Sequence, residues 1–64
     1  MTPERRDTLE ALQPNGLSDT VGEIARKVRN ENLAEVQRNL LWLQRNGYVK
    51  VSGIWWHRTG KEAK

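Results

Sequence analysis

A chain of 64 residues is enough for one small domain, and its lack of cysteine excludes disulfide bonds and thiolate metal sites. Its apolar runs are only a few residues long, far short of the about 20 residues of a membrane-spanning helix. The charged N-terminal segment lacks the apolar stretch of a secretion signal, so we expect a cytoplasmic protein. We expect one domain, residues 1–58, followed by a flexible basic tail, residues 59–64.

The net charge of +3 is unevenly divided along the chain. Residues 1–25 hold two basic and five acidic side chains, a net charge of −3, whereas residues 26–64 hold nine basic and three acidic ones, a net charge of +6. This asymmetry favours a polyanionic partner for the C-terminal part, although lysines and arginines also serve solubility alone.

The first predicted helix begins at Pro3 and is about ten residues long. Thr2 can cap it, and proline suits the first helical position. The sequence QPNG, at residues 13–16, ends the segment. Three side chains share one face of this helix: Arg5, Leu9 and Leu12.

The second predicted helix begins with the capping box TVGE, in which Thr20 and Glu23 bond reciprocally. Its apolar stripe consists of Val21, Ile24, Ala25 and Val28. Gly22 lowers the helix propensity but permits close approach of another helix. Just upstream, Leu17 and Ser18 form a very short predicted strand.

The third predicted helix spans residues 33–46 and follows the turn RNEN. Asn32 caps it, and Glu35 lies three residues further on. Gly47 supplies the left-handed residue that ends it. Four apolar residues recur at helical spacing, within a sector of about 80°. They are Leu33, Val36, Leu40 and Leu43.

From residue 48 the period changes to two, which predicts a β-hairpin. With Ser52 and Gly53 as a two-residue turn, Lys50 pairs with Trp55. The inner face then holds Val49, Val51, Ile54 and Trp56. The outer face holds Tyr48, Lys50, Trp55 and His57. A slip of one residue in the register would exchange the two tryptophans.

The order of elements over residues 3–58 resembles the winged helix-turn-helix family. Its recognition-helix pattern, V-x-R-x-L-x-x-L-x-x-x-G-x-V, is matched by VQRNLLWLQRNGYV, and TVGEIARKV resembles the supporting helix. The resemblance implies an α+β fold, a small winged helix-turn-helix with three helices plus a C-terminal β-hairpin wing. Winged helices serve as DNA-binding or as protein-interaction modules, so fold alone does not decide the function.

In this family the third helix enters the major groove of double-stranded DNA. The face opposite the apolar sector suits that role, because glutamine can pair with adenine, arginine with guanine, and alanine permits close approach. Its residues are Ala34, Gln37, Arg38, Leu41 and Arg45. Gln37 and Arg38 are the main candidates for base contacts, although Glu35 lies within one turn of Arg38 as an alternative partner.

Further candidates for DNA binding surround this helix. Asn32 would hydrogen-bond a phosphate at the helix N-terminus. The flanking candidates are Arg26, Lys27 and Arg29 before the turn, and Lys50 and Trp55 on the hairpin.

A more distant similarity links EVQRNLLWLQRNGYV to the Z-DNA-binding subgroup of the family. In that alignment Gln37 replaces the subgroup's asparagine and Leu41 its key tyrosine. The loss of the tyrosine argues against recognition of Z-form DNA.

We therefore expect a sequence-specific DNA-binding protein, a small transcriptional regulator or a phage- or plasmid-type control protein. Because one short helix makes few base contacts, a palindromic site and a homodimer are expected. The alternative is a protein-interaction winged helix, an adaptor or complex subunit, anchored by Leu41, Trp42 and Trp55. We predict no enzyme activity, metal or cofactor, since His57 is isolated and no nucleophile or phosphate-loop signature is present.

Overall fold

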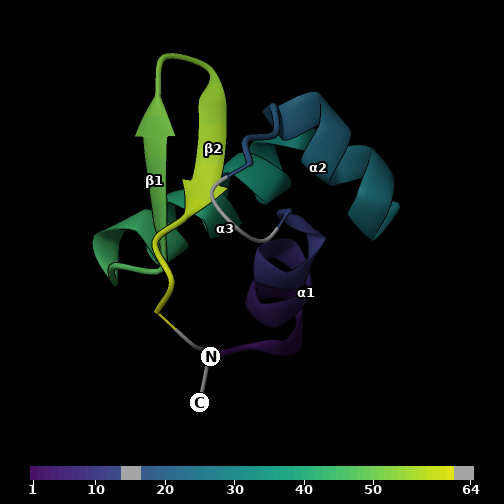
Figure 1. The fold of residues 1–64 in the computed structure, drawn as a ribbon. Helices are drawn as coiled ribbons and strands as arrows, with labels where there is room; N and C mark the ends of the chain where they lie inside the picture. Colours follow the sequence, from purple (N-terminus) through teal and green to yellow (C-terminus); the bar gives the residue numbers. More distant parts are fainter. Residues whose placement is uncertain (14–16, 62–64) are drawn as a thin grey trace.

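The computed structural model describes residues 1–13 and 17–61, which form three helices followed by a two-stranded antiparallel hairpin (Figure 1). The helices are α1 (Pro3–Ala11), α2 (Val21–Val28) and α3 (Leu33–Arg45). The strands are β1 (Val49–Ser52) and β2 (Trp55–Arg58). The predicted α+β layout is confirmed, while residues 14–16, part of the predicted turn, lie outside the described residues. None of the helices described has the length and apolar character that crossing a membrane requires.

The side chains at the N-termini of α2 and α3 form the predicted caps. The Glu23 amide donates to Thr20 Oγ1 at 3.3 Å, and the Thr20 amide donates to Glu23 Oε1 at 3.1 Å, which completes the capping box. Asn32 Oδ1 accepts from the Glu35 amide at 3.2 Å. Each cap satisfies a backbone donor that a bare helix end would leave without a partner, and so fixes where the helix begins.

The C-terminus of α3 is closed by a Schellman motif. The Tyr48 amide donates to the Leu43 carbonyl at 2.9 Å, and the Gly47 amide donates to the Gln44 carbonyl at 3.1 Å. Gly47 has a φ of +84°, which is the reason for a glycine at this point. The helix end is therefore well defined, and β1 leaves α3 in a fixed direction.

The hydrophobic core lies between the three helices and the inner face of the hairpin. Its buried apolar side chains are Leu9, Leu12, Ile24, Ala25, Val36, Leu40, Leu43, Val49 and Trp56. Leu33 was predicted to join them, but this first residue of α3 is 53% exposed. Gly22 likewise does not serve close helix packing, since a Cβ there would meet only Thr20 Oγ1, at 4.0 Å.

The predicted hairpin turn is wrong by one residue. Ser52 pairs with Trp55, so that Gly53 and Ile54 form the turn, and Gly53 has a φ of +63°. Short hairpin turns require positive φ at their first central residue, and glycine adopts it without strain. Ile54, predicted on the inner face, is consequently 65% exposed at the tip.

Moving the turn by one residue shifts every cross-strand pairing by two, so the alternation of faces is preserved. Val51 is paired with Trp56, and Lys50 with His57. Trp56 is buried at 4% exposure, whereas Trp55 is 46% exposed. The predicted division between an inward and an outward tryptophan is therefore confirmed, although the partners of both differ from those expected.

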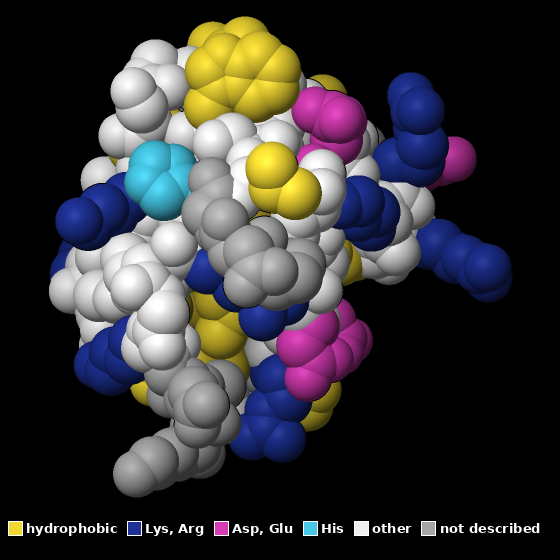
Figure 2. Space-filling view, in the orientation of Figure 1, with side chains coloured by type: hydrophobic (Ala, Val, Ile, Leu, Met, Phe, Trp, Pro, Cys, Tyr) yellow, Lys and Arg dark blue, Asp and Glu magenta, His cyan; other side chains and the backbone are white. Residues whose placement is uncertain are grey.

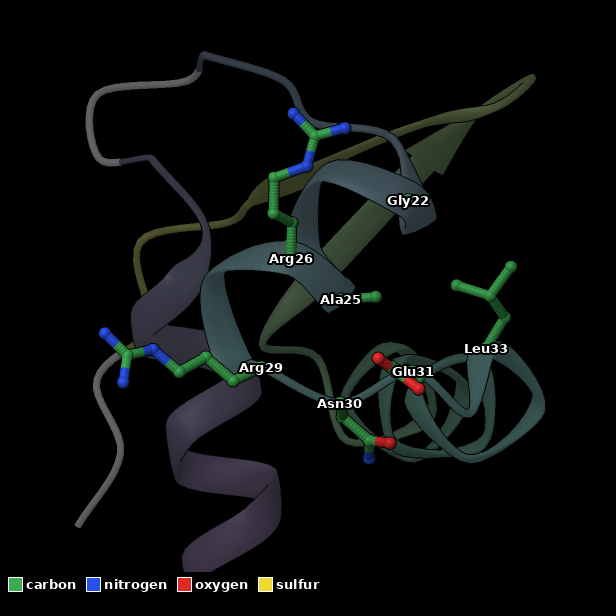
Figure 3. Close-up of a pocket in the computed structure, with 7 residues that line it drawn as sticks. All are labelled: Gly22, Ala25, Arg26, Arg29, Asn30, Glu31 and Leu33. Atoms are coloured by element: carbon green, nitrogen blue, oxygen red, sulfur yellow. The ribbon is translucent and has the colours of Figure 1, made fainter.

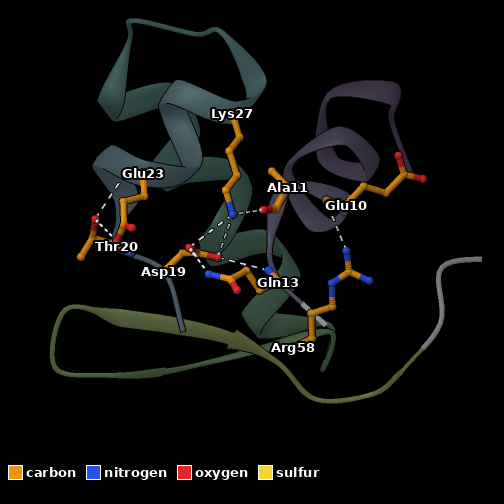
Figure 4. A network of polar contacts seen from close by, with 8 residues as sticks. All are labelled: Glu10, Ala11, Gln13, Asp19, Thr20, Glu23, Lys27 and Arg58. Atoms are coloured by element: carbon orange, nitrogen blue, oxygen red, sulfur yellow. Dashed lines mark hydrogen bonds and ion pairs between the residues drawn. The ribbon is translucent and has the colours of Figure 1, made fainter. Parts of the chain in front are cut away.

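The buried carboxylate of Asp19 joins three parts of the chain (Figure 4). Its side chain accepts from the Gln13 amide at 3.1 Å, from Gln13 Nε2 at 3.3 Å and from Lys27 Nζ at 3.3 Å. Its backbone exchanges two hydrogen bonds with Trp56, of 2.9 and 2.8 Å. Asp19 thus ties the end of α1, the helix α2 and the strand β2 together.

Two cations bind the carbonyl groups at the C-terminus of α1. Lys27 Nζ donates to the Ala11 carbonyl at 3.0 Å, and Arg58 Nη2 donates to the Glu10 carbonyl at 3.0 Å. Positive charge is favourable at this negative end of the helix dipole. The short strand predicted at residues 17–18 is reduced to the single β-bridge made by Asp19.

The predicted tail, residues 59–64, begins with residues that are bonded to the domain. The Thr59 amide donates to the Tyr48 carbonyl at 3.0 Å, and its hydroxyl donates to the Gly47 carbonyl at 2.6 Å. Residues 62–64 lie outside the described residues. The hairpin is therefore followed directly by a segment that returns to the end of α3.

Burial by itself raises the pKa of Asp19, but the hydrogen bonds from Gln13 and Lys27 and the charge of Lys27 outweigh it. The pKa of this carboxyl group therefore lies below its ordinary value of 3.8. The unfolded chain therefore binds a proton at this carboxyl group more tightly than the folded protein does. The ionised carboxylate contributes its full stabilisation of the folded state at pH values above that ordinary pKa. This stabilisation is lost as the pH falls through the pKa of the folded state.

We predict that Asp19→Asn lowers the free energy of unfolding at neutral pH by about 2 kcal/mol, because an amide cannot accept all of these donors. The variant should also lose less stability than the wild type on acidification from about pH 5 to about pH 2. Thermal unfolding across this range measures both effects, with Asp7→Asn, at an exposed position, as the control. Equal behaviour of the two variants would contradict the role given to Asp19.

The two tryptophans of β2 should differ strongly in their effect on stability. Trp56→Ala is expected to cost about 3–5 kcal/mol, enough to unfold most of a domain this small. Trp55→Ala should cost less than about 1 kcal/mol, because its side chain lies largely outside the core. Circular dichroism during thermal denaturation would reveal the difference, and similar losses for both would contradict the observed register.

Candidate nucleic-acid interface

Five predicted site residues lie on the exposed strip of α3, the side of the helix away from the core. α1, α2 and β1 all contact the opposite side of this helix. The residues of the strip, all exposed, are Ala34, Gln37, Arg38, Leu41 and Arg45. The strip is therefore accessible along the 13 residues of α3, a length of about 20 Å.

The polar side chains of this strip are not engaged by other described residues. Within residues 1–13 and 17–61 the one ion pair joins Lys27 to Asp19, so the alternative pairing of Arg38 with Glu35 is not formed. Since the guanidinium group of Arg38 has no ion-pair partner among the described residues, its N–H donors remain for an external acceptor.

The other predicted phosphate contacts before α3 differ in their availability. Lys27 is held by Asp19 and by the Ala11 carbonyl, so its ammonium already has acceptors. Asn32 uses its carbonyl oxygen for the helix cap and leaves its amide donors without a partner among the described residues. Arg26 and Arg29 are exposed.

Arg29 adopts an unusual backbone conformation between α2 and α3. Its φ and ψ are 56° and 40°, and it is the one residue other than glycine with positive φ in the described parts of the chain. Its amide donates to the Arg26 carbonyl at 3.2 Å, and the next amide, of Asn30, donates to the Ala25 carbonyl at 3.0 Å. A position typical of glycine therefore carries a basic side chain here.

A shallow hollow of about 380 Å³ lies between α2 and the start of α3 (Figure 3). Ala25 and Leu33 border it, whereas the side chains of Arg26 and Arg29 point away from it. Gly22, Asn30 and Glu31 complete its lining. Within the described residues, no group of three or more metal-binding side chains comes together.

A second hollow, of about 350 Å³, lies between α1 and α2. Asp7 and Glu10 of α1 line it together with Lys27 and Arg29. Carboxylates so close to basic groups lower the positive potential on this side of the molecule. The basic residues before α3 thus form a mixed-charge surface rather than a purely basic one.

Trp42, an expected anchor of the protein-interaction alternative on the exposed surface, instead packs against the core. Its ring is half-buried and lies parallel to that of Tyr48, with 6.2 Å between centroids and 12° between the planes. The guanidinium of Arg5 lies 4.4 Å from the Trp42 ring centroid. Trp42 sits on the flank of α3 that α1 covers, which helical periodicity alone does not reveal.

The predicted contact residues of the hairpin are exposed but do not pair with each other. Lys50 lies opposite His57, and Trp55 lies opposite Ser52. Ile54, which was not a predicted site residue, is exposed beside Trp55, and apolar surface appears over the hairpin tip in Figure 2. The preference of such turns for glycine at their first position was the signal that would have placed Ile54 outside.

No protein-family model matches the chain, and no curated protein matches it. The likeness to winged helix-turn-helix proteins therefore rests on the recognition-helix pattern and on the order of helices and strands.

We predict that Arg29→Gly does not lower the free energy of unfolding and raises it by up to about 1 kcal/mol. Glycine adopts positive φ without a steric cost. The matched control is Arg26→Gly, which places glycine inside α2 and should lower stability by about 1 kcal/mol. Urea denaturation measures both variants. A clear loss of stability in Arg29→Gly would contradict the left-handed conformation at this residue.

Proposed function

We propose that this protein binds double-stranded DNA sequence-specifically, with α3 in the major groove. The observation that carries the proposal is the exposed strip of α3, whose arginine and glutamine side chains have no partner among the described residues. A major groove about 12 Å wide admits one α-helix. The net charge of +6 on residues 26–64 supports a polyanionic ligand.

Each residue type on the strip has a partner among the base edges. The Arg38 guanidinium can donate two hydrogen bonds to guanine, and the Gln37 amide can pair with adenine. Leu41 can contact the methyl group of thymine, and the small side chain of Ala34 allows the helix to approach closely. These contacts would discriminate between sequences, whereas contacts to phosphate would not.

Few base contacts come from one helix, so binding as a homodimer to a palindromic site follows from the proposal. A small transcriptional regulator or a phage- or plasmid-type control protein would work in this way. Assigning the chain to the winged helix-turn-helix family belongs to the same proposal.

A protein-interaction module is the second candidate, favoured by three exposed apolar side chains. They are Leu41, Ile54 and Trp55. Trp42, the third anchor expected for this role, is stacked on Tyr48 and therefore less accessible. Light scattering combined with DNA titration separates the candidates, because a monomer that binds no duplex would favour the interaction module.

The direct test is a fluorescence titration with random-sequence duplexes near 50 mM salt, followed by selection of preferred sites from a random library. A protein that binds no duplex under these conditions would contradict the proposal, since a basic groove reader binds at least non-specifically there.

Substitution of Arg38 should affect specific binding most. Arg38→Ala is expected to weaken binding to the selected site by about 1–3 kcal/mol. Arg38→Lys, the matched control for charge, should retain non-specific binding but lose most of the discrimination, because an ammonium group cannot form the bidentate contact. An equal loss on selected and random duplexes would show that Arg38 contacts phosphate rather than a base.

A further inference from the structure

The exposed charges along α3 oppose the dipole of the helix. Its N-terminus, where the dipole is positive, carries the exposed carboxylates Glu31 and Glu35. Its C-terminus, where the dipole is negative, carries the exposed Arg45. A bare helix would attract phosphate at its N-terminus, and these side chains shift the positive potential toward the other end.

Lys61 strengthens this reversal because it is bound at the C-terminus of α3. Its Nζ donates to the Asn46 carbonyl at 2.9 Å, and it lies 4.7 Å from the ring centroid of Tyr48. An ammonium group has three donors, so the bond to Asn46 leaves others for a second acceptor. The cation both offsets the negative end of the dipole and adds a net positive charge there.

A row of four side chains, the cation–aromatic row, holds this end of the molecule together. Its members in spatial order are Arg5, Trp42, Tyr48 and Lys61. The row connects α1, α3 and the residues after β2, so its two cations are positioned before any ligand arrives. Side chains ordered in advance lose less conformational entropy on binding.

The surroundings of this row contrast with those of α2. On the face shown in Figure 2, lysine and arginine at the edge of the hairpin and of the C-terminal end of α3 have no acidic neighbours in view. On the α2 side, basic and acidic side chains are intermingled, and Asp7 and Glu10 adjoin Arg29 there. On this face, the basic side chains beside the C-terminal end of α3 are therefore less intermingled with described carboxylates than those beside α2.

We propose that Lys61, together with Arg45 and with Arg5 at the far end of the row, contacts the phosphate backbone of DNA beside the C-terminal end of α3. The inference rests on the proposed function and places the principal backbone contact there, away from Arg26 and Arg29. Lys61 acts as a positioning contact that carries no sequence information.

The test compares two single substitutions that each remove one positive charge, Lys61→Gln and Arg26→Gln, in titrations of duplex DNA at several salt concentrations. One lost phosphate contact reduces the slope of log K against log salt by about 0.9, so Lys61→Gln should lose about 3.5-fold less affinity than the wild type between about 50 and about 200 mM salt. The change should be the same on selected and random duplexes, and Arg26→Gln should reduce the slope by less than Lys61→Gln does.

Lys61→Arg, which keeps the charge, should restore the wild-type slope, and thermal unfolding of each variant shows whether the fold is intact. A wild-type slope in folded Lys61→Gln, or a reduced slope in Arg26→Gln alone, would overturn this inference while leaving DNA binding in place. Failure of the wild-type protein to bind any duplex would instead contradict the proposed function, and the inference with it.

Discussion

The buried carboxylate of Asp19 is the point on which the arrangement of this small domain depends. Its side chain accepts from Gln13, two residues after α1, and from Lys27 of α2, while its backbone pairs with Trp56 of β2. A domain of 64 residues has a small apolar core, so one polar contact that joins three elements contributes a large share of its stability. Because the acceptors are matched by donors, the carboxylate stays charged in spite of its burial.

This constraint determines how α3 is presented. α1 and α2 are joined to each other and to β2 through Asp19 and Lys27, and α1, α2 and β1 pack against α3. The opposite side of α3 is left without a covering element among the described residues. The polar network around Asp19 therefore holds together elements that pack on one side of α3, while the other side stays accessible.

Local features of the chain were predictable because they depend on neighbouring residues. The capping box of Thr20 and Glu23 and the closure of α3 at Gly47 follow from side-chain chemistry and backbone conformation within a few positions. The exposed strip of α3 follows from helical periodicity. The opposite orientation of Trp55 and Trp56 was predicted correctly although the turn was not. The cross-strand pairing differs from the predicted one by two residues, which keeps each side chain on its face.

Features that depend on tertiary packing were not predictable from the sequence. Trp42 is covered because the N-terminal part of α1 lies against that flank of α3. Lys27 pairs with Asp19, eight positions earlier. Asp19 lies before the start of α2, so helical spacing does not predict this pair. The position of Lys61 over Tyr48 likewise requires the chain to return after β2. Helical period and charge counts contain no information on these contacts.

The central claim is that the exposed strip of α3 contacts DNA, and amide chemical shifts recorded while a duplex is added to isotopically labelled protein test it most directly. We predict that the largest changes lie at Ala34, Arg38, Leu41 and Arg45, with the amides of α1 little affected. Changes confined to the hairpin tip, or no change at any duplex concentration at low salt, would contradict it.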